Sequence, residues 1–345
     1  MVSIINPILN QSWAEFINRN SKATIFHHPA WLSVLQRQYG FRVFAVCTLN
    51  PDNAIRSGIP FCEVRSIGGN IKWISLPFSD HCTPLYESES DLLEILDYSI
   101  KNINPEGKYS IEIRSDVSST HKLFQRKSDS VLHIKELSNT IDNVFASLKK
   151  TQVQQPILKG MRDGLTCRVS IEKDSLKDFY RLHLLTRRRL GVPVQPRKFF
   201  DEVFENIIRK NLGFTVLVFK DKQCISAGIF SGYAHTLTYK YGASDDTMLH
   251  WRPNNLMVWT AMQEAVKRGF TYFDFGKTDD ENEGLRKFKS GWGVTEQPLY
   301  YSYYPVVPRN SLLLTLKNKL AAPLIRHSPM FVCRWTGEIL YRFFA

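Results

Sequence analysis

Two stretches of the chain alternate hydrophobic and polar residues on both sides of a polar turn, the pattern of a β-hairpin. The first, FRVFAVCTLNPDNAIRSGIPFCEV, covers residues 41–64 and turns at residues 50–53. The second, FTVLVFKDKQCISAGIFSGY, covers residues 214–233 and turns at residues 220–222. Because the pattern Ile-x-x-Gly-Ile recurs in both, the sequence predicts a duplicated unit in which Gly58 and Gly228 are equivalent.

A helical pattern precedes each hairpin, at residues 29–40 and 175–191. We expect the second of these helices to begin with the capping box Ser175-x-x-Asp178 and to end at Gly191. A strand at 235–244 follows the second hairpin, then a helix at 253–269 capped by Asn254 or Asn255, then a strand at 271–276. Antiparallel strands followed by a helix and another strand predict an α+β sheet.

Composition and charge add a division of the chain. Its 345 residues are 43% hydrophobic and suit two folded domains, which we expect at 1–150 and 151–308, followed by a basic amphipathic extension at 309–345. Residues 1–150 carry 16 Lys and Arg against 15 Asp and Glu, whereas residues 151–345 carry 29 against 18. The second half therefore suits an anionic partner, such as RNA, a nucleotide, a diphosphate-linked lipid or a membrane, although solubility alone also accounts for the excess.

Several classes of protein are disfavoured. The six cysteines are scattered, and no histidine pair has zinc-ligand spacing, so we expect neither a disulfide framework nor a metal site. The N-terminal residues do not resemble a secretory signal, and no apolar run is long enough to span a bilayer, so we expect a cytoplasmic protein. The chain lacks G-x-S-x-G and P-loop motifs, and its Asp-Phe-Gly at 274–276 has no His-Arg-Asp partner.

The segment GLRKFKSGWG, residues 284–293, carries the strongest candidate chemistry. A lysine on a short glycine-flanked loop beside Phe288 and Trp292 can approach a phosphate or a carbonyl oxygen that gains charge, and Lys289 is the first candidate. Alternatively, the aromatics are core and the cations are solvated. Asp274 ends its strand, where a carboxylate can orient or deprotonate an acceptor amine, or serve only as a structural hydrogen-bond acceptor.

The order of elements resembles the GNAT acyltransferase fold used twice, which implies tandem GNAT-like domains, each a mixed, mainly antiparallel sheet flanked by helices. Residues 254–278 followed by GLRKFKSGWG are similar to the second half of the Fem-type aminoacyl transferases, and to their FemAB-like relatives in particular. SLKKTQVQQPILKGMRDGL at 147–165 resembles the helix that joins the domains in that family, and LPFSDHCTPL at 76–85 is also similar. The resemblance implies that Lys289 is functional, and we take Lys289 and Asp274 as the catalytic candidates.

The donor remains open between two classes. GNAT enzymes hold coenzyme A with [RQ]-x-x-G-x-[GA], but the stretch from Arg252 to Met257 has neither glycine, which disfavours acyl-CoA without excluding it. Fem-type enzymes use aminoacyl-tRNA, and the basic second half suits RNA phosphates. We expect no tightly bound cofactor and no DNA partner. The candidates for binding donor or substrate are Arg252, Asn254, Asn255, Arg189, Tyr241 and Trp292.

The combined hypothesis is an acyltransferase that moves an acyl or aminoacyl group to an amine on a cell-envelope or polysaccharide precursor. A CoA-dependent N-acetyltransferase is the first alternative, and a non-catalytic RNA- or membrane-binding protein with a decayed site is the second. The tail at 309–345 has six Lys and Arg against one acidic residue, with apolar positions that include Phe331, Trp335 and Ile339. Such a tail either packs on the catalytic domain or lies on the inner face of a membrane.

Overall fold

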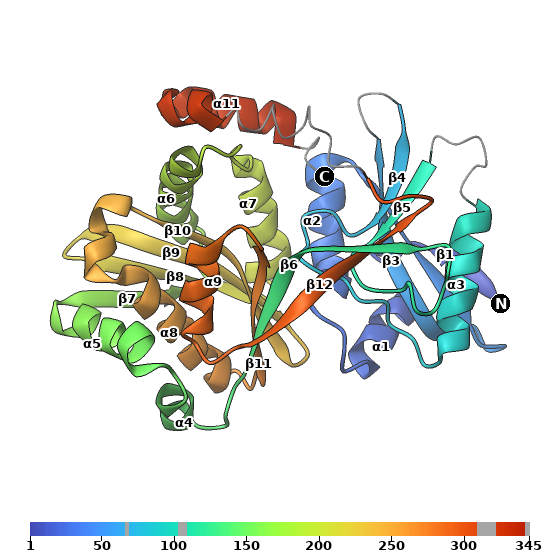
Figure 1. Cartoon of the computed structure of the whole chain (residues 1–345), viewed down its shortest axis with the longest axis horizontal. Coiled ribbons are helices and arrows are strands. Elements are labelled where there is room, and N and C mark those ends of the chain that lie inside the picture. The colour runs from blue at the N-terminus through green and yellow to red at the C-terminus, as the bar shows by residue number, and fades with distance from the viewer. Residues whose placement is uncertain (66–68, 103–108, 309–321, 342–345) are drawn as a thin grey trace. The chain divides into compact units, whose positions relative to one another are not determined.

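The computed structural model describes residues 1–65, 69–102, 109–308 and 322–341 (Figure 1). The described residues form two compact units: residues 1–131 with 298–308, and residues 132–297 with 322–341. These units do not follow the division at residue 150 that composition favoured. The reason is that strands β6 (Gln125–Glu136) and β12 (Thr295–Tyr304) each begin in one unit and end in the other.

The first unit contains a mixed sheet in the order β1-β2-β3-β4-β5-β12. Neighbours from β1 to β4 are antiparallel, β4 and β5 are parallel, and β12 pairs antiparallel with β5. Its elements are β1 (Val2–Ile5), α1 (Gln11–Arg19), α2 (Pro29–Tyr39), β2 (Arg42–Leu49), β3 (Ile55–Arg65), β4 (Ile71–Ser75), α3 (Glu89–Asn102) and β5 (Tyr109–Ile113).

The second unit repeats this order of strands as β6-β11-β10-β9-β8-β7, again antiparallel from β7 to β10 and parallel between β10 and β11. Figure 1 shows α6 on one side of these strands and α8 on the other. The elements are α4 (Ile141–Ala146), the π-helical turn η2 (Lys150–Gln154), α5 (Gln155–Arg162), β7 (Leu165–Ser170), α6 (Ser175–Leu190), α7 (Arg197–Val203), η3 (Phe204–Ile208), β8 (Gly213–Lys220), β9 (Gln223–Tyr233), β10 (Thr236–Ser244), α8 (Pro253–Lys267), β11 (Tyr272–Asp279), α9 (Glu283–Ser290) and α11 (Met330–Leu340).

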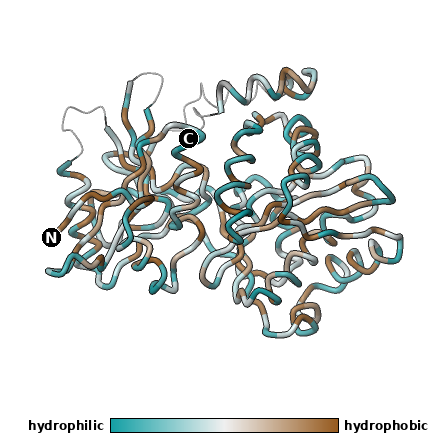
Figure 2. The backbone as a smooth tube through the Cα atoms, turned by 180° about the vertical axis from the view of Figure 1, so that it is seen from behind, coloured by the Kyte–Doolittle hydropathy of each residue, from teal (hydrophilic) through white to brown (hydrophobic). Residues whose placement is uncertain are grey.

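The predicted α+β fold class and the predicted duplication of topology are therefore confirmed. Helix α3 packs on β1, β2 and β3, and α8 packs in the same way on β7, β8 and β9. Hydrophobic stretches follow the strands of both units in Figure 2, because each sheet is covered by helices and its side chains are buried.

The predicted equivalence of Gly58 and Gly228 is wrong. A Cβ on Gly58 would meet the indole of Trp13 on α1, whereas a Cβ on Gly228 would meet Met257 on α8. The two glycines thus face opposite sides of their sheets, because side chains alternate along a strand and a difference of one residue reverses the face.

The helix ends also differ in detail from the predictions. Asp174, not Ser175, is the N-cap of α6, and the Ser175 hydroxyl donates instead to the Glu172 carbonyl, so the predicted capping box does not form. Gly191 ends the helix with φ 71° as predicted. Helix α8 is preceded by Arg252 in the left-handed conformation, with Pro253 as its first residue, so the asparagines are inside the helix.

Candidate active site in the second unit

Strands β10 and β11 diverge, and this divergence is the main feature of the second unit. Over these two strands, which the structure describes in full, parallel pairing covers three residue pairs and stops at Thr238 opposite Asp274. The remaining lengths, residues 239–244 of β10 and 275–279 of β11, are called the fork below. Backbone groups in the fork therefore need partners other than a strand paired across it.

A β-bulge in β10 determines which side chains reach the fork. The pairing of β10 with β9 shifts between Tyr239 and Tyr241, so Lys240 is the extra residue. Tyr239 packs against Phe230, on the side of α8, whereas Tyr241 packs edge-on against Phe200, in α7. Residues two apart would otherwise share a face, so the bulge turns the candidate Tyr241 to the side of α6 and α7.

Asp274 lies at the point where the fork begins. Its side chain is fully buried, one carboxylate oxygen accepts a hydrogen bond from the Gly276 N–H at 2.7 Å, and the other lies 3.5 Å from the Thr238 hydroxyl. Gly276 has φ 69°, a conformation that glycine adopts without strain. The carboxylate therefore holds the backbone of β11 where it leaves β10.

Lys289 lies on the last turn of α9, so the prediction that it occupies a loop is wrong. Gly284 does not break this helix, because Asn282 caps it by accepting from the Leu285 N–H. The Lys289 side chain is only 4% exposed, and its ammonium donates to the carbonyls of Gly276 and Lys277 at 2.9 Å each. Both catalytic candidates thus meet on one short piece of β11, and Lys287 is exposed as expected.

A network of ionisable side chains lies beside Lys289. His133 is buried, with its Nε2 3.0 Å from the Glu296 carboxylate, and Arg286 makes a bidentate ion pair with the same carboxylate. Burial and then the positive charge of Lys289 lower the pKa of His133. The hydrogen bonds from Arg286 lower the pKa of Glu296. Sequence analysis missed this network because its members are separated by up to 163 residues.

The two glycines of Gly-Trp-Gly serve packing. A Cβ on Gly291 would lie 2.9 Å from Val153, and one on Gly293 would lie 2.9 Å from the Ser147 carbonyl. Trp292 is fully buried in the hydrophobic core against Phe275 and Phe288. This part of the motif therefore anchors α9 to the segment that precedes α5, and the geometry gives Trp292 no surface for a substrate.

The start of α8 offers few backbone donors. Pro253 has no N–H, and the N–H groups of Asn255 and Leu256 both donate to the Arg252 carbonyl. The Asn254 amide oxygen accepts from the Ser226 hydroxyl at 2.8 Å, and the Asn255 amide donates to the Gln152 carbonyl. Both asparagine side chains thus make hydrogen bonds within the protein.

Arg252, in contrast, is exposed and lines a groove of about 450 Å³ beside α5. The same groove is lined by Lys159 and Arg162, so three cations meet where α8 begins. The Trp251 ring adjoins it, with the Lys159 ammonium 5.4 Å from the ring centroid. Lys159 and Arg162 belong to the basic segment 147–165, but their role was not predicted, because only the fold brings that segment to α8.

The arginines that end α6 separate. Arg189 is exposed, and Arg188 donates to the Arg326 carbonyl. Arg187, which was not predicted, lies near the hydroxyls of Tyr241 and Tyr341, and burial lowers its pKa while those hydroxyls oppose the shift. Its Nε donates to the Pro193 carbonyl at 2.8 Å. A half-buried guanidinium beside Tyr241 is a stronger anion-binding candidate than the exposed Arg189.

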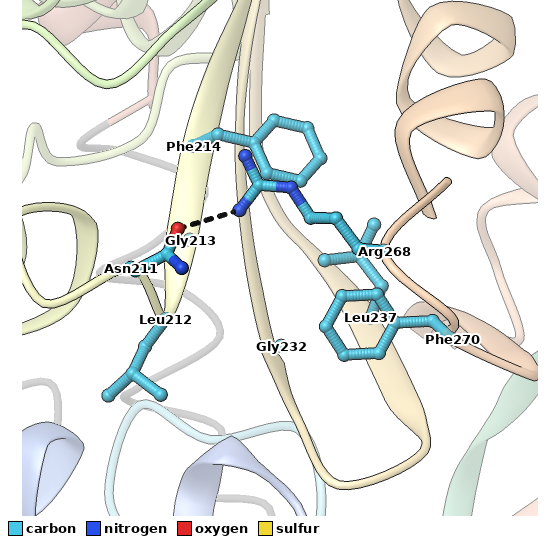
Figure 3. A pocket seen from close by; sticks show the side chains of 8 residues that line it. All are labelled: Asn211, Leu212, Gly213, Phe214, Gly232, Leu237, Arg268 and Phe270. Carbon is cyan, nitrogen blue, oxygen red and sulfur yellow. Dashed lines mark hydrogen bonds between the residues drawn. The ribbon is translucent and has the colours of Figure 1, made fainter. Parts of the chain in front are cut away.

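A separate pocket of about 270 Å³ lies at the other end of the sheet, where β8 and β10 begin (Figure 3). The Arg268 guanidinium stacks 4.6 Å from the Phe214 ring centroid and forms an ion pair with Glu264. It also donates to the Asn211 amide oxygen at 3.3 Å. These contacts satisfy the guanidinium, so the pocket adds no reactive group to the site.

Within the parts of the chain that the structure describes, no group of three or more His, Cys, Asp or Glu side chains is placed to hold a metal ion. Over the same residues, none of the helices has both the length and the apolar character required to cross a bilayer.

Comparisons with known proteins identify the class of the second unit. Residues 151–290 match the family model for the acetyltransferase (GNAT) domain. A tandem GNAT protein from the clavulanic acid biosynthesis pathway has a similar fold, with a TM-score of 0.52 at 6% identity over 88% of this chain and 98% of its own.

Two further comparisons point to one branch of that class. FemX, in its crystal structure, superposes with a TM-score of 0.72 at 16% identity, covering 92% of this chain and 100% of its own. A lipid II:glycine glycyltransferase of Staphylococcus aureus (strain USA300) is 36% identical over 106 residues, which are 26% of this chain and 24% of that protein. The match thus spans about a quarter of the curated relative. The expected resemblance to the FemAB-like branch of the GNAT superfamily is confirmed.

Proposed function

We propose that the chain is a transferase that moves an acyl or aminoacyl group from an activated, anionic donor to an amine on a cell-envelope or polysaccharide precursor. The observation that carries the proposal is the fork, where the buried Asp274 and Lys289 converge on the backbone of β11. Transfer to an amine needs no covalent enzyme intermediate if donor and acceptor are held in line and the developing oxyanion is stabilised.

The roles follow from the chemistry of each group. The Lys289 ammonium carries the charge that a developing oxyanion needs, in a site from which water is excluded, so its effect is larger than at the surface. Asp274 is the candidate to orient or deprotonate the acceptor amine. Arg187 and Tyr241, on the side of α6 and α7, are candidates for holding an anionic part of the substrate.

Aminoacyl-tRNA is the donor that the start of α8 favours. A diphosphate needs several backbone N–H groups. Pro253 has no N–H, and the N–H groups of Asn255 and Leu256 already donate to the Arg252 carbonyl. The groove formed by Arg252, Lys159 and Arg162 instead provides side-chain cations beside Trp251, which suits a nucleic-acid backbone. The CoA-dependent N-acetyltransferase remains the second candidate, because the matched domain is named for acetyl transfer.

The acceptor is proposed by analogy. The names of the relatives specify glycyl transfer and lipid II, which supports an amine of an envelope precursor and a site of action at the inner face of the membrane. The identity of the acyl group is not specified by any contact in the site.

One experiment tests the reaction class. The purified chain is incubated with charged tRNA or with acyl-CoA, together with amine-bearing envelope precursors, and products are identified by mass spectrometry. We expect a precursor whose mass increases by one aminoacyl residue, with charged tRNA as donor. An increase with acyl-CoA alone would favour the N-acetyltransferase, and no product with either donor would favour a binding protein with a decayed site.

The groove has its own test. Replacing Arg252 and Arg162 with Gln should weaken tRNA binding and make it less sensitive to salt, with the slope of log K against log salt reduced by roughly 0.7–0.9 for each phosphate contact that is lost. Lys267→Gln, at the opposite end of α8, is the matched control, because that lysine is exposed and lies far from the groove along the helix. If the salt dependence of tRNA binding has the same slope for the wild type, the Arg252, Arg162 double variant and Lys267→Gln, the groove does not bind tRNA.

A further inference from the structure

Helix α11 has one packed face and one exposed aromatic face. Cys333, Gly337 and Tyr341, four residues apart, are buried, and Gly337 approaches the Val194 carbonyl too closely for any side chain. Phe331 and Trp335, also four residues apart, are 73% and 69% exposed. Two residues of offset on a helix correspond to about 200°, so the aromatics point away from the body of the second unit.

The helical segment before α11 carries a further exposed apolar side chain. Residues 322–327 are helical, and Leu324 is 71% exposed. This segment lies against the end of α6, because Arg188 donates to the Arg326 carbonyl and Gly191 has no room for a Cβ next to Ala322. Leu324, Phe331 and Trp335 are hereafter called the aromatic face.

Arginines lie on α11 and on the segments that pack against one another next to it. Arg326 and Arg189 are exposed, and Arg188 is near enough to Cys333 to oppose the burial-driven rise in the pKa of that thiol. Arg334 forms an ion pair with Glu338, so the single acidic side chain described on α11 is already neutralised. Exposed Trp and Phe on one helix face, with an exposed Leu and arginines close by in the chain, are typical of segments that lie in the interface of an anionic bilayer.

We propose that the aromatic face is a membrane-docking surface that inserts into the headgroup region of an anionic bilayer, with the flanking arginines on its phosphates. Docking of this kind would bring the second unit to a lipid-linked acceptor, and in that respect it builds on the proposed function. The evidence for membrane binding itself comes only from the aromatic face and its arginines. An anionic bilayer fits better than a second copy of the chain, because a second copy would bring the arginines against one another.

The experiment measures vesicle binding with no substrate present, so its result is independent of transferase activity. The full chain is cosedimented with two kinds of vesicle, one of phosphatidylcholine alone and one that also contains about 30% phosphatidylglycerol. The second represents an anionic membrane surface. We expect binding to the anionic vesicles that falls at least tenfold in the double variant Phe331→Gln, Trp335→Gln. Arg326→Gln should weaken binding about fivefold and reduce its salt dependence.

The control is the double variant Leu9→Gln, Leu123→Gln, which removes exposed apolar side chains from the first unit and should bind as the wild type does. Equal thermal unfolding of the variants excludes loss of fold as the cause. Wild-type protein that does not bind anionic vesicles, or a Phe331, Trp335 variant that binds equally well, would overturn the proposal. So would self-association in solution that this variant abolishes, since the surface would then belong to a second copy.

Discussion

The two units share one topology but differ where their parallel strands meet. In the first unit, β4 and β5 are paired over their whole length, from Ile71 opposite Tyr109 to Ser75 opposite Ile113. Beyond them the Ser75 hydroxyl accepts from the Arg114 N–H, and the Arg114 carbonyl accepts from Cys82. In the second unit, pairing of β10 with β11 stops after three pairs.

This difference indicates which unit can bind a ligand within its sheet. The segment LPFSDHCTPL closes the first unit at the position where the second unit is open, and the Arg114 guanidinium is occupied by Glu112 and stacks on Tyr301. In the second unit, the backbone of β11 at the corresponding position is bound by the side chains of Asp274 and Lys289, which are candidate reactive groups, and not by a neighbouring strand or loop. We therefore propose that the chemistry takes place in the second unit and that the corresponding part of the first unit is structural.

The largest expected effect is at Lys289. Lys289→Met keeps the apolar stem but removes the charge, and should lower kcat by about a hundred- to a thousandfold, by analogy with loss of an oxyanion-hole donor. It also leaves two buried carbonyls without their donor, so some loss of stability is expected and must be measured separately by thermal unfolding. Lys287→Met, at an exposed position on the same helix, should retain nearly full activity.

A folded Lys289→Met protein with the wild-type rate would show that α9 only packs, and would remove the main reason for separating the units by function.

The sequence was informative where local residues determine structure. Both hairpins and the helix at 253–269 were predicted, because turn residues and a regular apolar face are local signals. The prediction of a loop for GLRKFKSGWG was wrong because Gly284 is a residue typical of turns. The N-cap hydrogen bond to Asn282 outweighs the low helix propensity of this glycine. The convergence of Lys289 with Asp274 could only be expected by resemblance, because it depends on how α9 returns to β11.

Three features could not be predicted: the divergence of β10 from β11, the basic groove beside α5, and the passage of β6 and β12 from one unit into the other. Each depends on pairing between segments distant in sequence, and a hydrophobic strand has the same pattern whether or not its neighbour stays beside it. Arg187 could not be distinguished from Arg188 and Arg189 as the arginine beside Tyr241, because the position of one of three adjacent cations in the fold has no signature in the residue types.

A buried histidine in each unit gives the next largest effect. Burial lowers the pKa of His27 in the first unit to about 4 and that of His183 in the second to about 3. Both are neutral when folded, so their contribution to stability is complete above about pH 6.5 and is lost as the pH falls toward the folded pKa. For His27 the loss is about 3 kcal/mol.

His27→Gln and His183→Gln should each flatten the acid limb of stability, measured by urea unfolding between pH 7 and pH 3. The flattening by His27→Gln should stop near pH 4, whereas that by His183→Gln should continue lower. Variants with the same pH dependence as wild type would mean that the rings are accessible to protons in the folded state.

Asp274→Asn tests the second catalytic candidate. The amide oxygen can still accept from Gly276, so the fold should survive while the charge is lost. We expect kcat to fall about a hundredfold, the lower end for loss of a general base, and the dependence of kcat on pH to change. An unchanged pH profile with a lower melting temperature would identify Asp274 as a structural acceptor only.

The smallest effects concern the two glycines on opposite faces. Gly58→Ala places a Cβ 2.6 Å from the buried Trp13 ring, whereas Gly228→Ala meets Phe230 at 2.8 Å and the Met257 sulfur at 2.9 Å. Overpacking should cost about 1–3 kcal/mol in each case, and more for Gly58, because an indole adjusts less than a methionine. Equal losses in urea unfolding would show that both sites relax equally.

The central claim is that the fork of the second unit is where the donor and acceptor meet, and hydrogen–deuterium exchange with and without a saturating donor tests it most directly. With aminoacyl-tRNA, amides of residues 239–244 and 275–279 should gain protection while those of 71–75 and 109–113 remain unchanged, and a separate measurement with acyl-CoA tests the second candidate donor. Protection confined to β4 and β5, or no change at the fork with a donor that the protein turns over, would contradict the account.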